Sequence, residues 1–383
     1  MNTRIFLHAV IVFLIINNVF IINGFAQTSN SDANNNTIKF PDIPGYLTLK
    51  CDFHQHTVFS DGEVWPSIRV KEAVKDGLDA ISITDHIEWL PHQNDIPNAD
   101  KNRIYQIAKK KVNGKDVTVL NGAEITRGMP PGHLNAIFLK DVNKLVQDDS
   151  IEVLKEAKNQ GAFIFWNHPH WIAHKPDGMA ELTELHKELI NNDLIHGIEI
   201  VNSRSYSDEA FQIAIDNNLT ILGNSDIHGL IEWEYKKTAE SHRPLTLVFA
   251  KEKTEKSIKE ALENQRTAVW FNNTLFGNDE YLIPLIQNSL IVKKVELLTS
   301  HKGNSLVQSV YIENISSMDY ILENNSEYTM HSHAKIFKLN AHEETIIQVK
   351  TLQDLSSFIL DLKVLNAFIA PNKKSEIQLK IEK

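Results

Sequence analysis

Nine side chains that could bind metal ions lie along the first two thirds of the chain, and most of them closely follow a segment typical of a β-strand. They are His54, His56, Asp61, His86, Glu124, His133, His168, Asp226 and His228. Imidazole and carboxylate groups together suit zinc, manganese or iron, and these metals need no thiolate ligand. We therefore expect two to three divalent transition-metal ions as cofactors.

Such a set of ligands suits phosphoester hydrolysis. Two metal ions about 4 Å apart lower the pKa of a bridging water, make hydroxide at neutral pH and hold phosphoryl oxygens for in-line attack. A third ion can neutralise charge that develops on the transferring group. A single His or Asp near a strand end usually caps the strand or forms a hydrogen bond. Nine such residues in order favour a metal centre instead.

Three further polar residues could act at the same site. Arg127, three residues past Glu124, and Arg204 could clamp a phosphate, although a surface salt bridge is the alternative for each. His170, two residues beyond His168, could protonate a leaving alkoxide if it lies within hydrogen-bond reach. The sequence thus predicts Glu124, Asp226 and His170 as catalytic residues and the two arginines as substrate-binding residues.

The sequence gives less indication of function for the tryptophans and the other histidines near these motifs. Trp166 is expected to pack in the core, and Trp171 lies where it could touch substrate. The other histidines of this region are expected to be structural or solvated, namely His92, His174, His186 and His196. His331 and His333 predict a surface strand or turn rather than a metal site.

Apolar, β-rich segments alternate with helical patterns up to about Phe271. Expected strands are 47–53, 79–84, 117–123, 134–139, 163–166, 197–201, 219–223, 245–250 and 267–271. Expected helices are 66–76, 101–112, 150–159, 179–191, 208–217 and 255–265. Repeated strand–helix units imply parallel strands, and a closed (β/α) barrel is the favoured interpretation. An open doubly wound sheet is the alternative, but neither glycine-rich phosphate loop of such folds is present.

The expected barrel places the ligands on one side, because such folds carry their chemistry on loops after the strands. His133 is the exception, since it precedes an expected strand. From about Phe276 the pattern changes to alternating strands, which suggests a small β-sandwich of roughly one hundred residues. The predicted domains are a linker at 27–46, the barrel at 47–275 and the β-rich domain at 276–383.

Composition limits the classes of partner. The chain has 383 residues, of which 42% are hydrophobic and 23% charged, as in a globular enzyme. A net charge of −10 argues against a general clamp for nucleic-acid backbones, so a small phosphoester is the expected substrate. Cys51 is the only cysteine, which excludes an intramolecular disulfide and a cysteine-based zinc site.

The N-terminus is typical of a secretory signal peptide. Arg4 precedes the apolar stretch 5–22, and a small-residue site ends at Ala26. We expect cleavage after Ala26 and an exported protein, periplasmic or secreted, without a stable membrane anchor. The alternative is an uncleaved anchor, although Asn17 and Asn18 interrupt the apolar stretch.

The motifs HQHTVFSDG, TDH, GAE, NHPH and SDIH resemble, in order, those of the PHP (polymerase and histidinol phosphatase) phosphoesterase family. The resemblance covers about Leu47–Phe271. It implies a distorted (β/α)7 barrel with a trinuclear metal centre. The exported layout and β-rich tail are most similar to exported PHP-type phosphodiesterases.

The resemblance also implies a distribution of ligands. His54, His56, Glu124 and Asp226 would hold one metal ion, and Glu124, His133 and His168 a second, so that Glu124 bridges the two. Asp61, His86 and His228 would hold the third ion. Some members have His where this chain has Asp61, a difference that could change the preferred metal.

Three classes of function follow. The first is metal-dependent hydrolysis of a phosphodiester or small organophosphate, with phosphomonoesterase activity as the alternative within the family. The second is an amidohydrolase-like hydrolase of C–N or C–O bonds, which would leave the TDH and SDIH motifs unexplained. The third is a non-catalytic metal-binding module, which would be expected to lack two or more ligands.

Overall fold

The computed structural model describes residues 37–383 apart from 113, 115, 237 and 299–305. The predicted signal peptide lies outside the described residues, as does the first part of the predicted linker. The later part of that linker is packed, because Ile43 is buried and the Phe40 ring lies 5.1 Å from that of Trp270. No helix in the described part of the chain is both long and apolar enough to cross a membrane.

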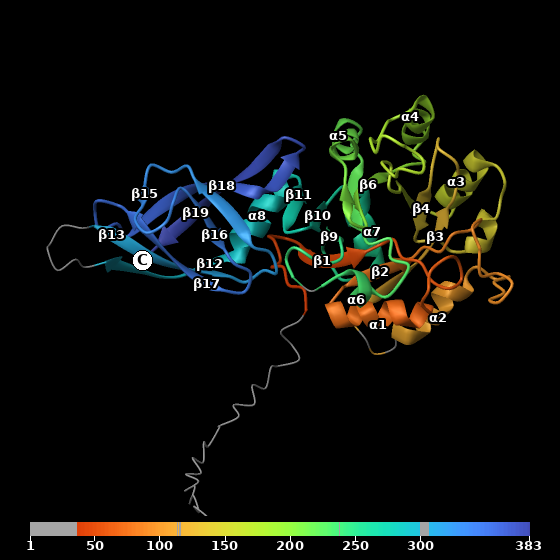
Figure 1. Ribbon diagram of the computed structural model, residues 1–383, viewed down its shortest axis with the longest axis horizontal. Helices are drawn as coiled ribbons and strands as arrows, with labels where there is room; N and C mark the ends of the chain where they lie inside the picture. The colour runs from red at the N-terminus through yellow and green to blue at the C-terminus, as the bar shows by residue number, and fades with distance from the viewer. Residues whose placement is uncertain (1–36, 113, 115, 237, 299–305) are drawn as a thin grey trace, which may run out of the picture. The chain divides into compact units, whose positions relative to one another are not determined.

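The first part of the chain forms a mixed sheet with helices (Figure 1). Its strands are β1 (Leu47–Asp52), β2 (Ala80–Ile83), β3 (Thr118–Ile125), β4 (Leu134–Ile137), β5 (Phe163–Trp166), β6 (Gly197–Asn202), β7 (Ser205–Tyr206), β8 (Thr220–Asn224), β9 (Leu245–Ala250), β10 (Thr267–Phe271) and β11 (Thr274–Gly277). Strands β1, β2 and β3 pair in parallel, as do β5, β6 and β8. The predicted α/β class is therefore confirmed.

One reversal in this sheet differs from the expected strand–helix alternation. Strand β4 pairs antiparallel with both β3 and β5. A short loop without a helix joins β3 to β4, and only antiparallel neighbours can be joined so briefly. The prediction of parallel strands was therefore wrong at β4, as it was at β9 and β10, which also pair antiparallel. Strand β11, which no expected strand covers, pairs antiparallel with β10.

All six expected helices form, but the one expected over 179–191 begins only at Glu184, where the side chain of Thr183 caps it. The helices are α1 (Pro66–Asp76), α2 (Arg103–Val112), η1 (Val142–Leu145), α3 (Ser150–Asn159), α4 (Glu184–Asn191), α5 (Asp208–Asp216), α6 (Ile231–Glu234), α7 (Glu255–Glu263) and α8 (Asp279–Ser289). Helix α1 starts with Pro66, whose fixed φ suits the first turn. It ends at Gly77 with φ 76°, a left-handed conformation that favours glycine.

The sheet does not close into a continuous backbone ladder among the described residues. Strand β8 pairs with β6, and side chains connect it to its other neighbours. The hydroxyl of Thr246 on β9 accepts from the N–H of Gly223 and donates to its carbonyl, both at 3.0 Å. The side chain of Asn224 accepts from Phe53 N–H at 2.8 Å, and one isolated bridge joins Gln55 to Ile227. Backbone pairing therefore does not form the expected closed barrel. Polar side chains join β8 to β9 and to the residue that follows β1.

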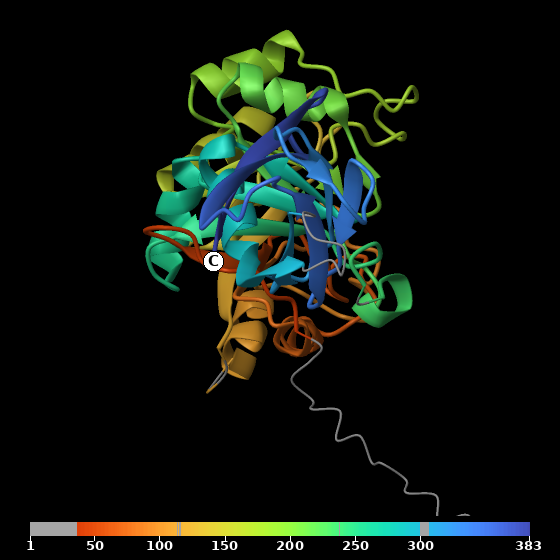
Figure 2. The same cartoon turned by 90° about the vertical axis from the view of Figure 1, so that its left-hand side faces the viewer.

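The C-terminal part consists of two sheets, as the alternating pattern predicted. Strands β12 (Leu290–Leu298), β13 (Val307–Asn314), β17 (Glu344–Lys350) and β15 (Thr329–Met330) form one sheet. Strands β14 (Tyr320–Asn324), β16 (Ile336–Leu339), β18 (Ser357–Ala370) and β19 (Lys373–Glu382) extend the other (Figure 2). Strand β18 pairs in parallel with β11, so the two parts of the chain share a sheet.

Candidate metal centre

The predicted ligands come together at one edge of the sheet. Most lie on the carboxyl-terminal ends of parallel strands: His54, His56 and Asp61 after β1, His86 after β2, Glu124 near the end of β3, His168 after β5, and Asp226 with His228 after β8. His133 precedes β4, and the antiparallel direction of β4 brings its start to the same edge as the end of β3. The reversed strand therefore explains why this one ligand comes before its strand.

The buried carboxylate of Glu124 lies at the centre of the cluster. Its two oxygens face different groups of imidazoles. Oε2 is 3.0 Å from His86 Nδ1, 3.3 Å from His56 Nε2 and 3.4 Å from His54 Nε2. Oε1 is 2.9 Å from His133 Nδ1 and 3.5 Å from His168 Nε2. A carboxylate placed between two groups of nitrogen donors has the arrangement that a bridging ligand requires.

Two aspartates complete the cluster on either side. Asp226 Oδ1 lies 3.1 Å from His54 Nε2 and 3.0 Å from His56 Nε2. Asp61 Oδ2 lies 3.4 Å from His86 Nε2 and 3.3 Å from His228 Nε2. All nine predicted ligands are therefore in contact with at least one other member of the set.

The donor atoms fit metal ions. Two tetrahedral ligands about 2.1 Å from one ion are roughly 3.4 Å apart, which matches the separations around Glu124 and Asp61. Three groups of donor atoms lie within 4.8 Å of one another: His56, Asp61, His86 and His228; His54, His56 and Glu124; and His86, Glu124 and His133. Glu124 Oε2 is buried without a hydrogen-bond partner, as expected for an atom that faces a cation.

The three groups of donor atoms differ from the distribution that the resemblance implies, and none of them includes Asp226 or His168. His56 and His86 each belong to two of the groups, whereas the resemblance gives each a single ion. The ring of His56 stacks on that of His228 with centroids 4.3 Å apart. Nine donors in mutual contact can therefore be divided among ions in more than one way.

The electrostatics keep the carboxylates ionised and one imidazole neutral. Burial alone would raise the pKa of Glu124, but His86, His54 and their neighbours hold it well below its usual value. Burial would also raise the pKa of Asp226, and His54 and His56 hold it likewise well below. Burial and the nearby His228 lower the pKa of His56 to about 3. Burial opposes protonation of His54 and His86, but the facing carboxylates, Asp226 for His54 and Glu124 for His86, raise the pKa of each imidazole. A metal ion binds the deprotonated imidazole, so its binding would displace these protons.

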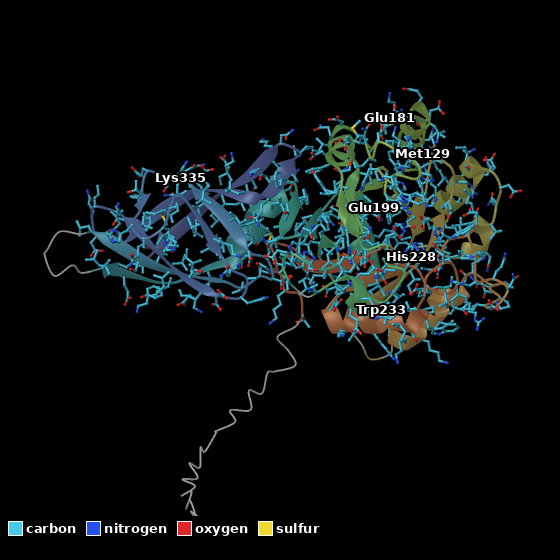
Figure 3. The ribbon with its side chains drawn as sticks, viewed as in Figure 1. Met129, Glu181, Glu199, His228, Trp233 and Lys335 are labelled. Carbon is cyan, nitrogen blue, oxygen red and sulfur yellow. The ribbon has the colours of Figure 1, made fainter. Side chains whose placement is uncertain are left out.

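A carboxylate that the sequence analysis did not identify holds two of the ligands. Glu199, on β6, is fully buried (Figure 3). Its Oε1 lies 2.9 Å from His54 Nδ1, and its Oε2 accepts from the backbone N–H of His168 at 2.9 Å. The side chains of Asn202 and Asn224 donate to the same carboxylate, each at 2.9 Å. An imidazole oriented in this way presents its other nitrogen, Nε2 of His54, to the cluster.

Two of the predicted ligands have a strained backbone. His168 and Asp226 have φ of 28° and 49°, in the left-handed region that residues other than glycine rarely adopt. Each such residue costs on the order of 1–3 kcal/mol, and the surrounding structure must hold it in place. The N–H of His168 is held by Glu199, and the N–H of Asp226 donates to His54 O at 2.9 Å.

A buried arginine ties two ligand loops together. Arg69, on α1, donates to the carbonyl of His56 at 2.9 Å and to that of His228 at 2.8 Å. The same guanidinium donates to the carbonyls of Ile227 and Gly229. The loops after β1 and β8 are therefore fixed relative to each other by one fully buried side chain.

The two arginines predicted to bind phosphate have other partners. Arg127 pairs with Glu88 and donates to the carbonyls of Thr126 and Gln147. Arg204 donates to the carbonyl of Glu234 at 2.6 Å and lies over the ring of Tyr235. Each guanidinium would have to leave these partners to bind a phosphoryl group, so their role stays a prediction.

His170 likewise has a partner outside the cluster. Its Nε2 lies 2.8 Å from Ser205 Oγ, and its Nδ1 is buried without a hydrogen-bond partner. Burial and the nearby His168 lower the pKa of His170. The predicted proton transfer to a leaving group therefore also stays a prediction.

His174, which the sequence analysis grouped with structural or solvated histidines, lies beside the cluster. Its ring centroid is 4.9 Å from that of His133 and 4.8 Å from that of Trp171. The ring of Trp171 is also 5.3 Å from His168 and 5.5 Å from His133. Trp166 is buried, as expected. The loop after β5 thus brings two further rings to the predicted ligands.

Comparison with known proteins shows which families the two parts of the chain match. Residues 52–227 match the family model for the PHP domain, and residues 294–380 match that for an Ig-like domain. An uncharacterized protein of Methanocaldococcus jannaschii is 30% identical over an alignment of 206 residues, and the match covers 49% of this chain and 87% of that protein.

A solved structure from Bacteroides vulgatus covers both domains. It is a two-domain protein containing a predicted PHP-like metal-dependent phosphoesterase. It is 39% identical, with a TM-score of 0.82, over 90% of this chain and 98% of that one. The chain belongs to the PHP domain family, and it has the fold of a PHP-like metal-dependent phosphoesterase followed by an Ig-like domain.

Proposed function

We propose that this protein hydrolyses phosphodiesters or small organophosphates at a centre of two to three zinc, manganese or iron ions. The observation that carries the proposal is the position of the Glu124 carboxylate, with imidazole nitrogens facing each of its oxygens. The chain matches a phosphoesterase family, and all nine predicted ligands are present. Both observations favour a hydrolase over a non-catalytic binding module. The net charge of −10 favours a small substrate over nucleic acid.

The residues have distinct roles in this proposal. When bound, the metal ions supply Lewis acidity toward phosphoryl oxygens and activate water. Glu124 would bind metal through both of its oxygens, and Asp226 would bind beside His54 and His56. Asp61, His86 and His228 would supply the donors on the other side of the cluster. Glu199 and Arg69 keep the ligand loops in place, because they bind the side chains and carbonyls of those loops.

A substrate screen tests the reaction class. Metal-loaded protein is assayed with bis(4-nitrophenyl) phosphate, 4-nitrophenyl phosphate, diethyl 4-nitrophenyl phosphate and 4-nitrophenyl acetate. We expect the anionic diester to be hydrolysed fastest, with activity removed by a chelator and restored by zinc, manganese or iron. Faster hydrolysis of the monoester would indicate a phosphomonoesterase. Hydrolysis of the acetate alone would contradict phosphoester chemistry.

The bridging role of Glu124 has its own test. Glu124→Gln keeps the shape but removes the charge, so the variant should bind at least one fewer metal ion and lose turnover by more than about a thousandfold. Elemental analysis and initial rates measure the two effects. Exposed Glu152→Gln, on α3, is the matched control. Near wild-type metal content and rate in Glu124→Gln would contradict the bridging role.

A further inference from the structure

An exposed tryptophan lies directly beside the predicted ligands. The indole of Trp171 is packed against the rings of His168 and His133, yet 43% of the residue is exposed. These two histidines are the ones that face Oε1 of Glu124. A group bound at this side of the metal centre would therefore have an open indole next to it.

The loop that carries Trp171 is held by its own hydrogen bonds. The N–H of Trp171 donates to His168 O at 2.9 Å, and the N–H groups of His174 and Lys175 donate to Trp171 O at 2.9 and 2.8 Å. Lys175 pairs with Glu181 further along the same loop at 2.7 Å. The indole is therefore positioned before any substrate binds, which reduces the entropy cost of using it.

The loop that carries Trp171 exposes further apolar side chains, and the indole also contacts the ring of His174, with centroids 4.8 Å apart. Ile172 is 71% exposed and Met179 is 52% exposed, both on the same loop. Lys175 is engaged by Glu181, and the guanidinium of Arg127 is engaged by Glu88. The available chemistry next to the cluster therefore suits an uncharged, planar group better than a second phosphate.

We propose that Trp171 forms a subsite that binds a planar, apolar ester group of the phosphoester substrate, an inference that rests on the proposed function. The phosphoryl group would lie at the metal centre while the planar group stacks on the indole. Offset or edge-to-face contacts between aromatic rings stabilise beyond the area that they bury. The substrate class is thus an aryl or similarly flat organic phosphoester.

Binding of two phosphonates tests this subsite without turnover. Metal-loaded protein is titrated calorimetrically with methylphosphonate and with phenylphosphonate, which differ only in the group that would reach the indole. We expect phenylphosphonate to bind about tenfold more tightly to the wild type, which corresponds to about 1.4 kcal/mol. Trp171→Ala should reduce this preference to less than about twofold, and Trp171→Phe should keep most of it.

Trp233 supplies the matched control. It is 67% exposed on α6, whereas Trp171 lies on the loop after β5. Among the described residues Trp233 has no ring contact with a predicted ligand. Trp233→Ala should therefore keep the full preference for phenylphosphonate. Unchanged binding of methylphosphonate to Trp171→Ala would show that the fold and the metal centre are intact.

Several results would overturn the inference. They are a preference below about twofold in the wild type, absence of phenylphosphonate binding, an unchanged preference in Trp171→Ala, or an equal loss in Trp233→Ala. The readout is independent of hydrolysis. A Trp171-dependent preference without phosphoester turnover would reject the proposed function and leave the subsite. Phosphoester turnover without such a preference would support the proposed function and reject the subsite.

Discussion

At the scale of single residues, two of the predicted ligands depend on a buried carboxylate outside the predicted set. Glu199 accepts four hydrogen bonds, two of them from ligand residues. One of these orients an imidazole, and the other holds the strained backbone of His168. Outer partners of this kind commonly affect metal affinity 10- to 100-fold when they are removed.

Glu199→Gln should therefore weaken metal binding about 10- to 100-fold. The amide keeps the size of the side chain, but its NH2 group would face two donors that now point to one carboxylate oxygen. Competition with a chelator of known affinity measures the effect. Exposed Glu188→Gln on α4 is the control. Wild-type metal affinity in Glu199→Gln would show that the carboxylate does not position the ligands.

At the scale of elements, strand direction decides which side chains meet. Because β4 runs antiparallel to β3, Asn135 lies opposite Glu124, and His133 reaches the Glu124 carboxylate from the start of its strand. A parallel β4 would place its start at the opposite edge of the sheet. The same rule explains why ligands from β1, β2, β5 and β8 share an edge without adjacent positions in the sequence.

A buried histidine between strands makes stability depend on pH. His242, just before β9, stacks on Trp270 of β10 with centroids 3.3 Å apart. Burial lowers the pKa of His242 to about 3. In the unfolded chain the imidazole of His242 binds a proton below about pH 6.5, whereas in the folded protein it stays neutral down to about pH 3. The contribution of His242 to the free energy of unfolding is therefore fully present above pH 6.5 and is lost as the pH decreases toward 3.

The variant His242→Gln should therefore lose less stability than the wild type between pH 6.5 and 4. The free energy of unfolding should change with pH more steeply in the wild type than in the variant, and the difference should approach about 1.4 kcal/mol per pH unit. Urea unfolding of the metal-free proteins at several pH values measures it, with exposed His331→Gln as the control. Parallel pH profiles for wild type and His242→Gln would mean that the imidazole is not excluded from protonation.

At the scale of the whole molecule, one hydrophobic core crosses from the PHP region into the strand-rich region. A single cluster includes Trp270 and Leu275 on β10 and β11, Leu282 on α8, and Leu360 and Ile381 on β18 and β19. Strand β11 also pairs with β18. The C-terminal strands therefore stabilise the part of the chain that carries the predicted metal ligands.

Removal of residues 290–383 should abolish cooperative folding of the remainder. Each large apolar side chain that loses its burial costs about 1.5–3 kcal/mol, and several such losses exceed the total stability of about 5–15 kcal/mol of most domains. Size-exclusion chromatography and thermal unfolding followed by circular dichroism are the measurements. A monomeric product with the melting temperature of the full chain would contradict the shared core.

The proposed export of the protein is also a property of the whole chain. Arg4, the apolar stretch 5–22 and the small-residue site at Ala26 support cleavage before Gln27. N-terminal sequencing of protein recovered from the periplasm or the medium should begin at or near Gln27. A chain that starts at Met1 and stays with the membrane fraction would support the uncleaved anchor.

The sequence by itself determined the features that depend on local residue type. The nine predicted ligands, their order and their positions at strand ends could be identified from the sequence, because each motif lies within a few residues of one element. The start of α1 at Pro66 and its end at Gly77 were readable for the same reason. The alternating strands of the C-terminal region also have a local pattern, and burial along β19 alternates accordingly.

Only the tertiary structure decided features that depend on contacts between distant positions. Glu199 lies in the apolar segment GIEIVN, and its partner His54 is 145 residues away. Its role depends on the register between strands, for which no local pattern exists. The direction of β4, the open ladder at β8 and the place of His174 beside His133 are of the same kind. Each follows from how complete elements pack together, because the energy that selects it is shared among residues far apart in the chain.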